Sequence, residues 1–490
     1  MHIAFFNAYD PRREYQESLP SLGIGYLMAY LKRHAPSIEV SFHHTEADLL
    51  ACGANVSAIS SASENFGAAQ RLARAVREAL GAFVLLGGVH ITALPHTLPR
   101  EFNAAVLGEG EETLLKLARL LEADRRPSPT DLGRIAGICF RDGDAVTITA
   151  PRPALADLDL LPWPDREGLG DRFKVPFARS VHLIASRGCP YKCTFCASGR
   201  LWKGYRVFSA AYVAGELAHV RARWNPREIH FFDDLFIGHR GRFRQFCRLL
   251  EERGLHQGVA FRSWGRADLV DEEMADALAR YNFRAIDLGL ESACHRTLEY
   301  LGKLGASPEV NQRALELLSA RGISVGVSMI IGAPRETREE MNETYDFLEA
   351  NRARIDRLGV GLLMPLPGTP VWDEAARRGV VSEEMEWERL GIDFESADIR
   401  RCPIVSETMD PGELAEMFRR FNALERVINA RGEVRRLAEE NARLAVELDA
   451  LRIELASLRG SRAVQLAMKV RDTIGRWRRG GKGAPSASRP

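Results

Sequence analysis

Short apolar runs alternate with helical patterns along most of this chain, and this alternation limits the possible folds more than any other feature. Within residues 1–150, strands are expected at Ile3–Phe6, near Val40, and at Val56–Ser60, Phe83–Gly87 and Ala104–Leu107, with helices at Leu22–His34, Asn65–Leu80 and Glu111–Ala123. Such alternation indicates a parallel sheet covered by helices on both faces. The sequence therefore predicts an α/β fold that begins with a doubly wound, Rossmann-like domain over 1–150.

A second alternating series begins near residue 180. Six strands are expected at 181–186, 228–232, 260–264, 285–290, 324–331 and 357–363, and five helices at 211–223, 241–253, 271–280, 308–321 and 338–351. Six strand–helix units favour a partial (β/α)6 barrel over 179–380, with its chemistry at the carboxyl ends of the strands. Before it, 138–148 is typical of a hairpin, and the Pro- and Asp-rich stretch 151–178 is expected to be a linker.

Composition excludes several classes of protein. The 490 residues carry a formal net charge of +1, so no overall field favours nucleic acid as a partner. No apolar run approaches the roughly 18–20 residues that span a bilayer, and the amino-terminal residues do not resemble a signal peptide, so a cytoplasmic location is expected. Five of the eight cysteines are scattered and three fall within eight residues. This distribution indicates metal or redox chemistry rather than a disulfide framework.

Cys189, Cys193 and Cys196 form a C-x₃-C-x₂-C motif directly after an expected strand. Thiolates are the usual ligands of iron–sulfur clusters, and a four-iron cluster normally takes four of them. This loop offers three, so the fourth iron would be free to bind a small molecule, for example through an amine and a carboxylate. The alternatives are three unrelated cysteines or a zinc site, which usually takes four ligands with a second pair further along the chain. The sequence shows no second pair.

The cysteine motif and the segments after it resemble the radical S-adenosylmethionine (SAM) superfamily. The resemblance covers about 180–380, in order through Phe195, Ile229–Asp234, Arg262–Asp268, Gly289–Ser292, Ile330–Pro334 and Met364–Pro370. It implies a [4Fe–4S] cluster on the three cysteines, reductive cleavage of SAM to a 5′-deoxyadenosyl radical, a small-molecule substrate, and an electron donor such as flavodoxin or ferredoxin. It also implies SAM contacts from Phe195, Asp233, Asp234, Arg266, Glu291, Gly332 and Pro365. Taken singly, the acidic pair could be a helix cap, Glu291 a surface carboxylate and Gly332 a turn.

The amino-terminal series resembles the cobalamin-binding domain that precedes the barrel in one class of this superfamily. The matching stretches are Leu19–Leu27, Gly87–His90 and Gly108–Leu114. The resemblance implies a corrin at the carboxyl edge of the sheet, where open α/β sheets bind ligands, near Ser60, Ser61, Gly87, Gly88, His90, Gly108 and Glu109. The D-x-H-x-x-G motif is missing, so no histidine is indicated as a cobalt ligand. The crossover before Val56 is short, so a shrunken domain without the cofactor is the alternative.

Three functions remain open from the sequence. The first is a cobalamin-dependent methyltransferase acting on a small molecule or on a cell-envelope or natural-product intermediate. The second is a radical SAM enzyme without cobalamin that catalyses a rearrangement, cyclisation or oxidation. The third is a non-catalytic coiled-coil scaffold with a degenerate core. The short stretch 458–463 resembles tails of bacterial surface-polysaccharide glycosyltransferases, which points toward a glycan pathway near a membrane.

The carboxyl-terminal part has a different pattern. Residues 381–426 are expected to be a helical segment, and 427–460 a coiled coil, because Val434, Leu437, Asn441, Leu444, Leu448, Leu451, Leu455 and Leu458 are spaced alternately by three and four. A parallel homodimer through 427–459 is expected, and a single helix packed on its own barrel is the alternative. Residues 461–479 are typical of a basic amphipathic helix that could lie on the inner face of a membrane or simply be solvated. Residues 481–490 are expected to be disordered.

Overall fold

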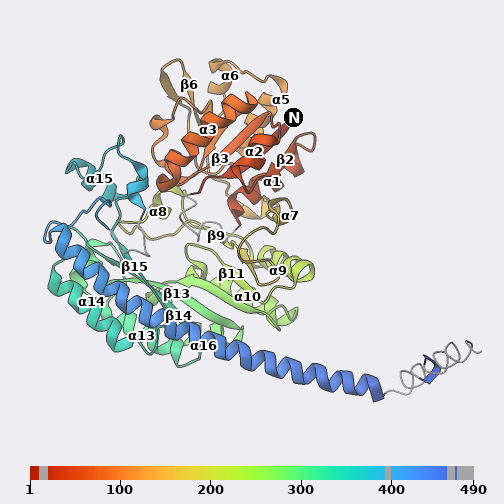
Figure 1. Ribbon diagram of the computed structural model, residues 1–490, viewed down its shortest axis with the longest axis vertical. Coiled ribbons are helices and arrows are strands. Elements are labelled where there is room, and N and C mark those ends of the chain that lie inside the picture. The colour runs from red at the N-terminus through yellow and green to blue at the C-terminus, as the bar shows by residue number, and fades with distance from the viewer. Residues whose placement is uncertain (10–19, 392–398, 461–468, 472–490) are drawn as a thin grey trace, which may run out of the picture. The chain divides into compact units, whose positions relative to one another are not determined.

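The computed structural model describes residues 1–9, 20–391, 399–460 and 469–471, and divides the chain into a compact unit, Met1–Ile428, and a second unit from Asn429 onward. The first series forms a seven-stranded sheet in the order β2-β1-β3-β4-β5-β6-β7 (Figure 1). Its strands are β1 (His2–Asn7), β2 (Glu39–Phe42), β3 (Val56–Ser60), β4 (Phe83–Gly87), β5 (Ala104–Val106), β6 (Ile138–Asp142) and β7 (Ala145–Ile148).

Strands β1 to β5 are parallel, and the predicted hairpin β6–β7 extends the same sheet in the antiparallel sense. The strand order reverses between β1 and β3, and open α/β sheets bind ligands at such a switch point. The expected strands and hairpin are confirmed in order and position.

Helices cover both faces of this first sheet, as the doubly wound prediction requires. They are α1 (Leu22–His34), α2 (Glu46–Ala51), α3 (Phe66–Leu80), α4 (Val89–Ala93), α5 (Glu111–Ala123) and α6 (Pro129–Gly133). One apolar cluster joins α1 and α5 to the sheet, and another joins α2 and α3 to it. The short crossover is spanned by the six-residue α2, whose amino terminus is capped by the Thr45 hydroxyl.

The stretch predicted as a linker is packed against the second series. It contains a 3₁₀ turn, η4 (Leu158–Leu160), and α7 (Arg166–Leu169). Arg166 is buried and donates to Glu216 at 2.7 Å and to the His182 carbonyl at 2.6 Å. Breaking a buried ion pair by removing one partner is strongly destabilising, so Arg166 fixes this segment to the second series. The neighbouring Asp165 accepts from Lys32 of the first series at 2.6 Å, so the segment contacts both series.

The second series forms a six-stranded parallel sheet in the order β15-β14-β13-β12-β11-β8. Its strands are β8 (Ser180–Leu183), β11 (Glu228–Phe231), β12 (Ala260–Gly265), β13 (Phe283–Glu291), β14 (Ser324–Ile331) and β15 (Arg357–Leu362). Between β8 and β11 lie the two-stranded ribbon β9 (Ser186–Arg187) and β10 (Arg206–Val207) and the short α8 (Ser198–Leu201). The six expected strands are present in order, and closure into a partial barrel stays a proposal.

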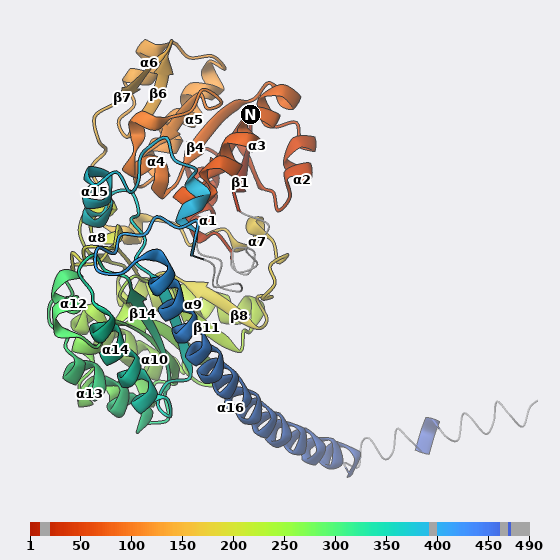
Figure 2. The same ribbon diagram turned by 60° about the vertical axis from the view of Figure 1, so that its left-hand side comes forward.

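The helices of the second series are α9 (Ala210–Trp224), α10 (Arg240–Glu252), α11 (Glu272–Arg280), α12 (His295–Tyr300), α13 (Pro308–Ser319), α14 (Arg338–Asn351) and α15 (Pro370–Arg377) (Figure 2). Short 3₁₀ turns also occur at η2 (Ser63–Asn65), η3 (Pro95–Thr97), η5 (Phe236–Gly238), η6 (Ala267–Leu269) and η7 (Trp387–Leu390). The five expected helices correspond to α9, α10, α11, α13 and α14.

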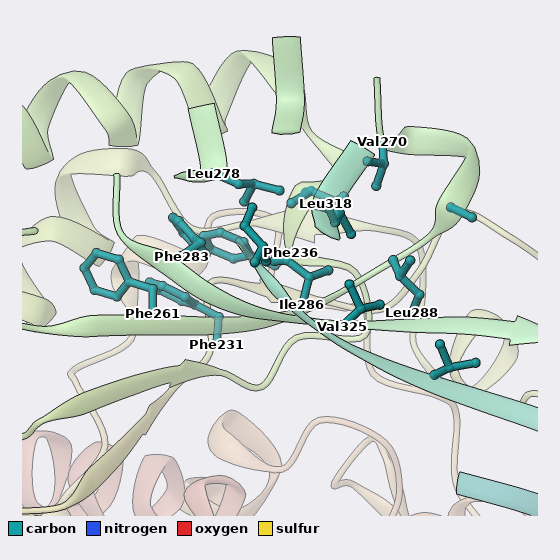
Figure 3. Close-up of a cluster of buried hydrophobic side chains, with 14 of the residues drawn as sticks. Phe231, Phe236, Phe261, Val270, Leu278, Phe283, Ile286, Leu288, Leu318 and Val325 are labelled. Carbon is teal, nitrogen blue, oxygen red and sulfur yellow. The ribbon is translucent and has the colours of Figure 1, made fainter. Parts of the chain in front are cut away.

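Aromatic side chains from neighbouring strands form the core of the second series (Figure 3). The rings of Phe231 and Phe236 lie 4.1 Å apart, and those of Phe261 and Phe283 lie 5.1 Å apart. These phenylalanines pack together with Leu278 of α11 and other helix residues. Because successive side chains of a strand point to opposite faces, the residues next to Phe231 and Phe261 point to the other face of the sheet.

The carboxyl-terminal helix α16 runs from Pro411 to Gly460 without a break. Residues 414–428 include buried apolar side chains, and the Glu425 carboxylate accepts the Val360 amide at 3.1 Å, so this end of the helix covers β15. Within the predicted helical segment 381–426, the described residues are helical only in η7 and in α16 from Pro411 onward, and the predicted coiled coil is the continuation of α16. No described helix is long and apolar enough to cross a membrane. Of the predicted basic helix 461–479 only residues 469–471 are described, and the tail 481–490 lies outside the described residues.

Candidate active site

The three cysteines of the motif lie at the carboxyl edge of the second sheet, in the loop that follows β8 and β9. Cys193 is buried, Cys189 and Cys196 are half-buried, and all three are free thiols. Gly188, at the start of the loop, has a φ of +78°, and a Cβ there would lie 2.4 Å from the Gly204 carbonyl oxygen. The approach of the two chain segments therefore requires glycine. Within the described residues, no three Cys, His, Asp or Glu side chains are arranged to hold a single metal ion.

Arg266, which follows β12, holds the cysteine loop in place. Its guanidinium carbon lies 3.6 Å from the centre of the Tyr191 ring, and its Nη1 lies 3.9 Å from the Cys193 sulfur. Asp268 accepts from Arg266 at 2.9 Å and from the Tyr191 hydroxyl at 3.1 Å. A cation stacked on an aromatic ring and hydrogen-bonded to a carboxylate is strongly oriented. The predicted Arg266 therefore contacts the cysteine loop itself.

The two predicted acidic residues after β11, Asp233 and Asp234, contact opposite ends of the cysteine loop. Asp233 is buried and accepts the Ala185 amide at 3.0 Å and the Ser186 hydroxyl, which fixes the chain just before the cysteine loop. Burial raises the pKa of Asp233 to about 6. Asp234 accepts the Ser198 hydroxyl, just beyond the loop. Both carboxylates thus brace the loop from its two ends.

Glu291 lies at the end of β13, where the register with β14 shifts. Its φ is +66°, a conformation that is uncommon for a residue other than glycine. Its buried carboxylate accepts from Lys303 at 2.6 Å. Burial raises the pKa of Cys196, and the charges of Asp234 and Glu291 raise it further. The structure therefore brings these two predicted carboxylates close to the cysteines.

The remaining predicted SAM residues lie at the same edge of the sheet. Phe195 is half-buried between two cysteines of the motif, and Pro365 is buried after β15. Gly332, after β14, donates its amide to Glu336 at 2.7 Å, and the Ala333 amide donates to the same carboxylate oxygen at 3.1 Å. Sequence reasoning missed Glu336, which lies two residues beyond the motif segment Ile330–Pro334 that carried the resemblance.

At the carboxyl edge of the first sheet there is a cavity of about 310 Å³. Its lining includes Asn7 and Ala8 at the end of β1, Ser60 and Ser61 at the end of β3, and Gly88 and Val89 after β4. The buried Ser61 hydroxyl has no hydrogen-bond partner among the described residues. Gly88 has a φ of +106°, and a Cβ there would lie 2.2 Å from the Ser61 carbonyl oxygen. The cavity thus lies at the switch point, with a free hydroxyl and a close backbone approach that only glycine permits.

Four of the residues predicted around a corrin do not line this cavity as the structure describes it: Gly87, His90, Gly108 and Glu109. The His90 ring lies 3.8 Å from Phe66 and 4.5 Å from Trp387, measured between ring centres, and its Nδ1 lies 3.0 Å from the Ser63 hydroxyl. Burial lowers the pKa of His90 to about 3. His90 is therefore a neutral, packed side chain that contacts the carboxyl-terminal segment around η7.

Glu109 joins the first series to the second. Its carboxylate pairs with Arg206 of β10 and lies 3.6 Å from Arg187 of β9, while Glu111 pairs with Arg187 from the other side. Burial alone would raise the pKa of Glu109, but Arg206 and Arg187 hold it below its usual value. The Arg187 guanidinium also lies over the ring of Tyr26 from α1, 5.3 Å from its centre. Because Arg187 is two residues before Cys189, this network links the first series to the base of the cysteine loop.

A layer of polar side chains on the face opposite the phenylalanine core also escaped sequence reasoning. Asp287 accepts from Arg262 at 2.6 Å and from Arg357 at 2.9 Å. Beside them the rings of His182 and His230 lie 5.3 Å apart, and burial lowers the pKa of these two histidines to about 4 and about 3. One nitrogen of each ring, His182 Nδ1 and His230 Nε2, has no partner among the described residues. The sequence contained one signal for this layer: single polar residues inside otherwise apolar strands, such as His230 between Ile229 and Phe231.

Comparison with known proteins gives one family and several relatives. The family model described as the Radical SAM superfamily matches residues 183–348. An uncharacterized methyltransferase of Pyrococcus horikoshii is 31% identical over 63% of this chain and 66% of its own length. An anaerobic magnesium-protoporphyrin IX monomethyl ester cyclase of Cereibacter sphaeroides is 29% identical over 59% of this chain and 48% of its own. The chain thus spans between about half and two thirds of these relatives.

A solved methyltransferase structure resembles this chain over most of its length. It is the radical SAM methyltransferase TsrM of Kitasatospora setae, described with cobalamin and a [4Fe–4S] cluster bound. The TM-score is 0.62 at 18% identity, and the match covers 77% of this chain and 78% of that one. At this identity the likeness establishes the fold alone.

Proposed function

Because this chain belongs to the radical SAM superfamily, we propose that it is an enzyme that binds a [4Fe–4S] cluster through Cys189, Cys193 and Cys196 and cleaves SAM reductively. The observation that carries the proposal is the set of three free thiols on one loop at the carboxyl edge of a parallel sheet, braced by Arg266. The donor set fits a four-iron cluster with one iron left for a small ligand. When bound, the cluster would supply one electron to SAM, and cobalamin would carry the methyl group.

The chain's own residues would orient these groups. Arg266 would donate toward the sulfur of Cys193, and Asp233 and Asp234 would fix the two ends of the loop. We propose four residues at the carboxyl edge of the second sheet as contacts of SAM. Phe195 lies in the cysteine loop, and Glu291, Gly332 and Pro365 lie at or after the ends of β13, β14 and β15. Glu336 would act as a positioning residue, because it holds the amides of Gly332 and Ala333.

We propose cobalamin as the second cofactor, at the cavity lined by Ser60, Ser61 and Gly88. The position at the switch point, the free Ser61 hydroxyl and the close backbone approach at Gly88 fit a flat ligand laid on the strand ends. The structural relative from Kitasatospora carries cobalamin, which supports this assignment. The residues that line the cavity include no histidine in the described part of the chain, so no histidine of this domain is proposed as a cobalt ligand.

Methyl transfer is the leading reaction. The relative from Pyrococcus and the structural relative are both named methyltransferases. We propose a small molecule or a cell-envelope or natural-product intermediate as the acceptor, and flavodoxin or ferredoxin as the electron donor. The polar layer around Asp287 would meet polar groups of the substrate, because two arginines share one carboxylate there and leave a positive charge.

Cyclisation is the second candidate reaction. The relative from Cereibacter is named a cyclase, and its sequence is nearly as similar as that of the methyltransferase relative. In that case the same cysteine loop would start a radical reaction that closes a ring in the substrate without transferring a methyl group.

The test is to incubate the anaerobically reconstituted enzyme with SAM and a strong reductant. Formation of 5′-deoxyadenosine supports radical SAM chemistry, and S-adenosylhomocysteine formed as well supports methyl transfer. Formation of 5′-deoxyadenosine alone, with cobalamin present, favours cyclisation or another radical reaction. If a protein with a full cluster forms neither product, the proposed activity is wrong.

A further inference from the structure

The second part of α16 carries an apolar seam that the described residues leave exposed. The seam comprises Val434, Leu437, Asn441, Leu444, Leu448, Leu451, Leu455 and Leu458. Of its described apolar side chains, the exposed fraction runs from 37% at Leu444 to 67% at Val434. By contrast, Leu414, Phe418, Phe421 and Leu424 of the same helix are almost fully buried. Contiguous exposed apolar surface of this kind marks an interaction site.

We propose that residues 434–458 form a parallel, two-stranded coiled coil with a second copy of this chain. The seam residues alternate by three and four, which is the spacing of a and d positions in a heptad repeat. Leucine occupies the four d positions, and the β-branched Val434 occupies the first a position. Leucine at d together with a β-branched residue at a favours a two-stranded coil. The inference comes from helix geometry and does not rest on the proposed chemistry.

Asn441 indicates the number and alignment of the strands. It is the one polar residue of the seam, at an a position. In a parallel, in-register pair the two a-position amides face each other and can hydrogen-bond. In an antiparallel pair, or in a shifted register, each would face leucine and remain unsatisfied in an apolar seam, which is costly. A buried a-position asparagine therefore specifies register and strand number at some cost in stability.

Charges beside the seam indicate the orientation. The g positions are all glutamate, at 433, 440, 447 and 454, and the e positions include Arg452 and Arg459. In a parallel pair Glu447 faces the partner's Arg452, and Glu454 faces the partner's Arg459. In an antiparallel pair g faces g, so rows of glutamate would oppose each other. Because e and g charges set orientation in coiled coils, this pattern selects the parallel pair.

The first experiment is light scattering of the full chain after size-exclusion chromatography. The proposal predicts a mass of twice 54.6 kDa for the natural sequence. It predicts the single-chain mass for the double variant Leu444→Glu/Leu451→Glu, with the thermal transition of the compact unit unchanged. A natural protein of single-chain mass, or of three or more chains, contradicts the proposal.

A matched control exists on the opposite side of the same helix. Val446 and Ile453 are apolar and exposed by 70% and 72%, but they occupy f positions outside the seam. The double variant Val446→Glu/Ile453→Glu introduces the same charge into the same helix and is expected to remain a dimer. If both double variants become monomeric, or neither does, the seam is not the interface.

Orientation is tested by cross-linking. A single Asn441→Cys variant places two thiols opposite each other only in the parallel, in-register pair, so mild oxidation should link most chains into covalent dimers. Glu439→Cys, at an f position, should give no more cross-linked dimer than the natural sequence with its eight cysteines. A dimer in which Asn441→Cys cross-links no better than Glu439→Cys contradicts the parallel arrangement.

Discussion

At the scale of single residues, the cysteine loop depends on contacts that come from other strands. Arg266 from beyond β12 contacts Tyr191 and the Cys193 sulfur, and Asp233 from beyond β11 fixes Ala185 and Ser186. Only the three thiols are expected to bind iron. The surrounding side chains are expected to set the loop's geometry and the charge around it, and these two effects can be separated by mutation.

Replacing one thiol is expected to remove the chemistry and leave the fold. Cys193→Ala should reduce bound iron and abolish formation of 5′-deoxyadenosine, because a four-iron cluster would be left with two protein ligands. Its melting temperature without cofactors should stay within a few degrees of the natural protein, since the loop lies outside the apolar core. Cys52→Ala, at a half-exposed cysteine in the first series, should change neither property. A Cys193→Ala protein that still forms 5′-deoxyadenosine would contradict the cluster assignment.

Arg266 is expected to tune the cluster more than to hold it. Removing its positive charge and its donor toward the Cys193 sulfur should make the reduction potential of the cluster more negative, because hydrogen bonds and net charge around cluster sulfurs set that potential. The measurement is a redox titration of Arg266→Gln followed by electron paramagnetic resonance. Lys192→Gln, an exposed cation in the same loop, is the control. An unchanged potential in Arg266→Gln would show that the side chain braces the loop without influencing the metal.

The sequence could place the cysteines and Arg266 near the strand ends, but it could not predict the contacts between these side chains. The cysteines and Arg266 could be predicted because the motif fixes their place in the chain. The contacts of Asp233 and Glu109 could not, since each lies at the expected strand end but has its carboxylate turned toward a neighbouring segment. The polar layer around Asp287 was missed because each member is a lone polar residue in an apolar strand and the group forms only when the strands pair.

At the scale of elements, the turn after β14 is held by a buried carboxylate. Glu336 accepts the amides of Gly332 and Ala333, and burial raises its pKa to about 7, although the two amides act to lower it. A carboxyl whose pKa is higher in the folded than in the unfolded protein binds its proton more tightly when folded. Its contribution to stability is full below the unfolded pKa and is lost as pH rises through the folded value.

The stability of the protein should therefore carry a pH dependence that belongs to Glu336. The free energy of unfolding should decrease between about pH 4.5 and pH 7 by a contribution that Glu336→Gln removes, while the amide oxygen can still accept from the turn. The measurement is chemical denaturation of the cofactor-free protein at several pH values. Glu339→Gln, in the first turn of α14, should keep the slope of the natural protein. The assignment fails if Glu336→Gln keeps that slope as well.

Helices and strands were predicted with the correct bounds where the periodic pattern of apolar residues extended over many residues. The helices at 22–34, 111–123 and 338–351 and the strand at 324–331 have the predicted bounds. The six-residue α12 and four-residue α8 were not foreseen, because such short helices show too little periodicity to identify. The two expected segments 381–426 and 427–460 share one helix, α16. Their different sequence patterns reflect a change from buried surroundings to an exposed seam within that helix.

At the scale of the whole molecule, the two α/β series are tied together by charge. Glu109 and Glu111 of the first series pair with Arg187 and Arg206 of the ribbon that precedes and follows the cysteine loop. The packed segment at Asp165 and Arg166 adds a second connection, because Asp165 pairs with Lys32 of α1 and Arg166 pairs with Glu216 of α9. Two separate alternating series could be predicted from the sequence, but these links between them could not, because they depend on residues far apart in the chain.

Breaking the first link is expected to affect both stability and the cysteine loop. Glu109→Gln would leave Arg206 without its charged partner and should destabilise the protein by about 3–5 kcal/mol, as removal of one member of a buried pair does. It should also broaden the resonance spectrum of the reconstituted cluster, because Arg187 would lose one of its two anchors. Glu109→Asp should restore part of the stability and part of the sharp spectrum. Glu101→Gln breaks a more exposed pair with Arg74 and should change neither the stability nor the spectrum strongly. A loss of stability with an unchanged spectrum would make the link purely structural.

The most direct test of the account is the metal content of the full chain. The protein is purified without oxygen, reconstituted with iron, sulfide and hydroxocobalamin, desalted, and analysed for metals alongside Ser60→Trp, which places a large ring in the cavity of the first sheet. The account predicts about four irons and one cobalt per chain, and in Ser60→Trp unchanged iron with little cobalt. Iron well below four per chain in a folded protein would contradict the cluster assignment. Four irons without cobalt in the natural protein would contradict the cobalamin assignment.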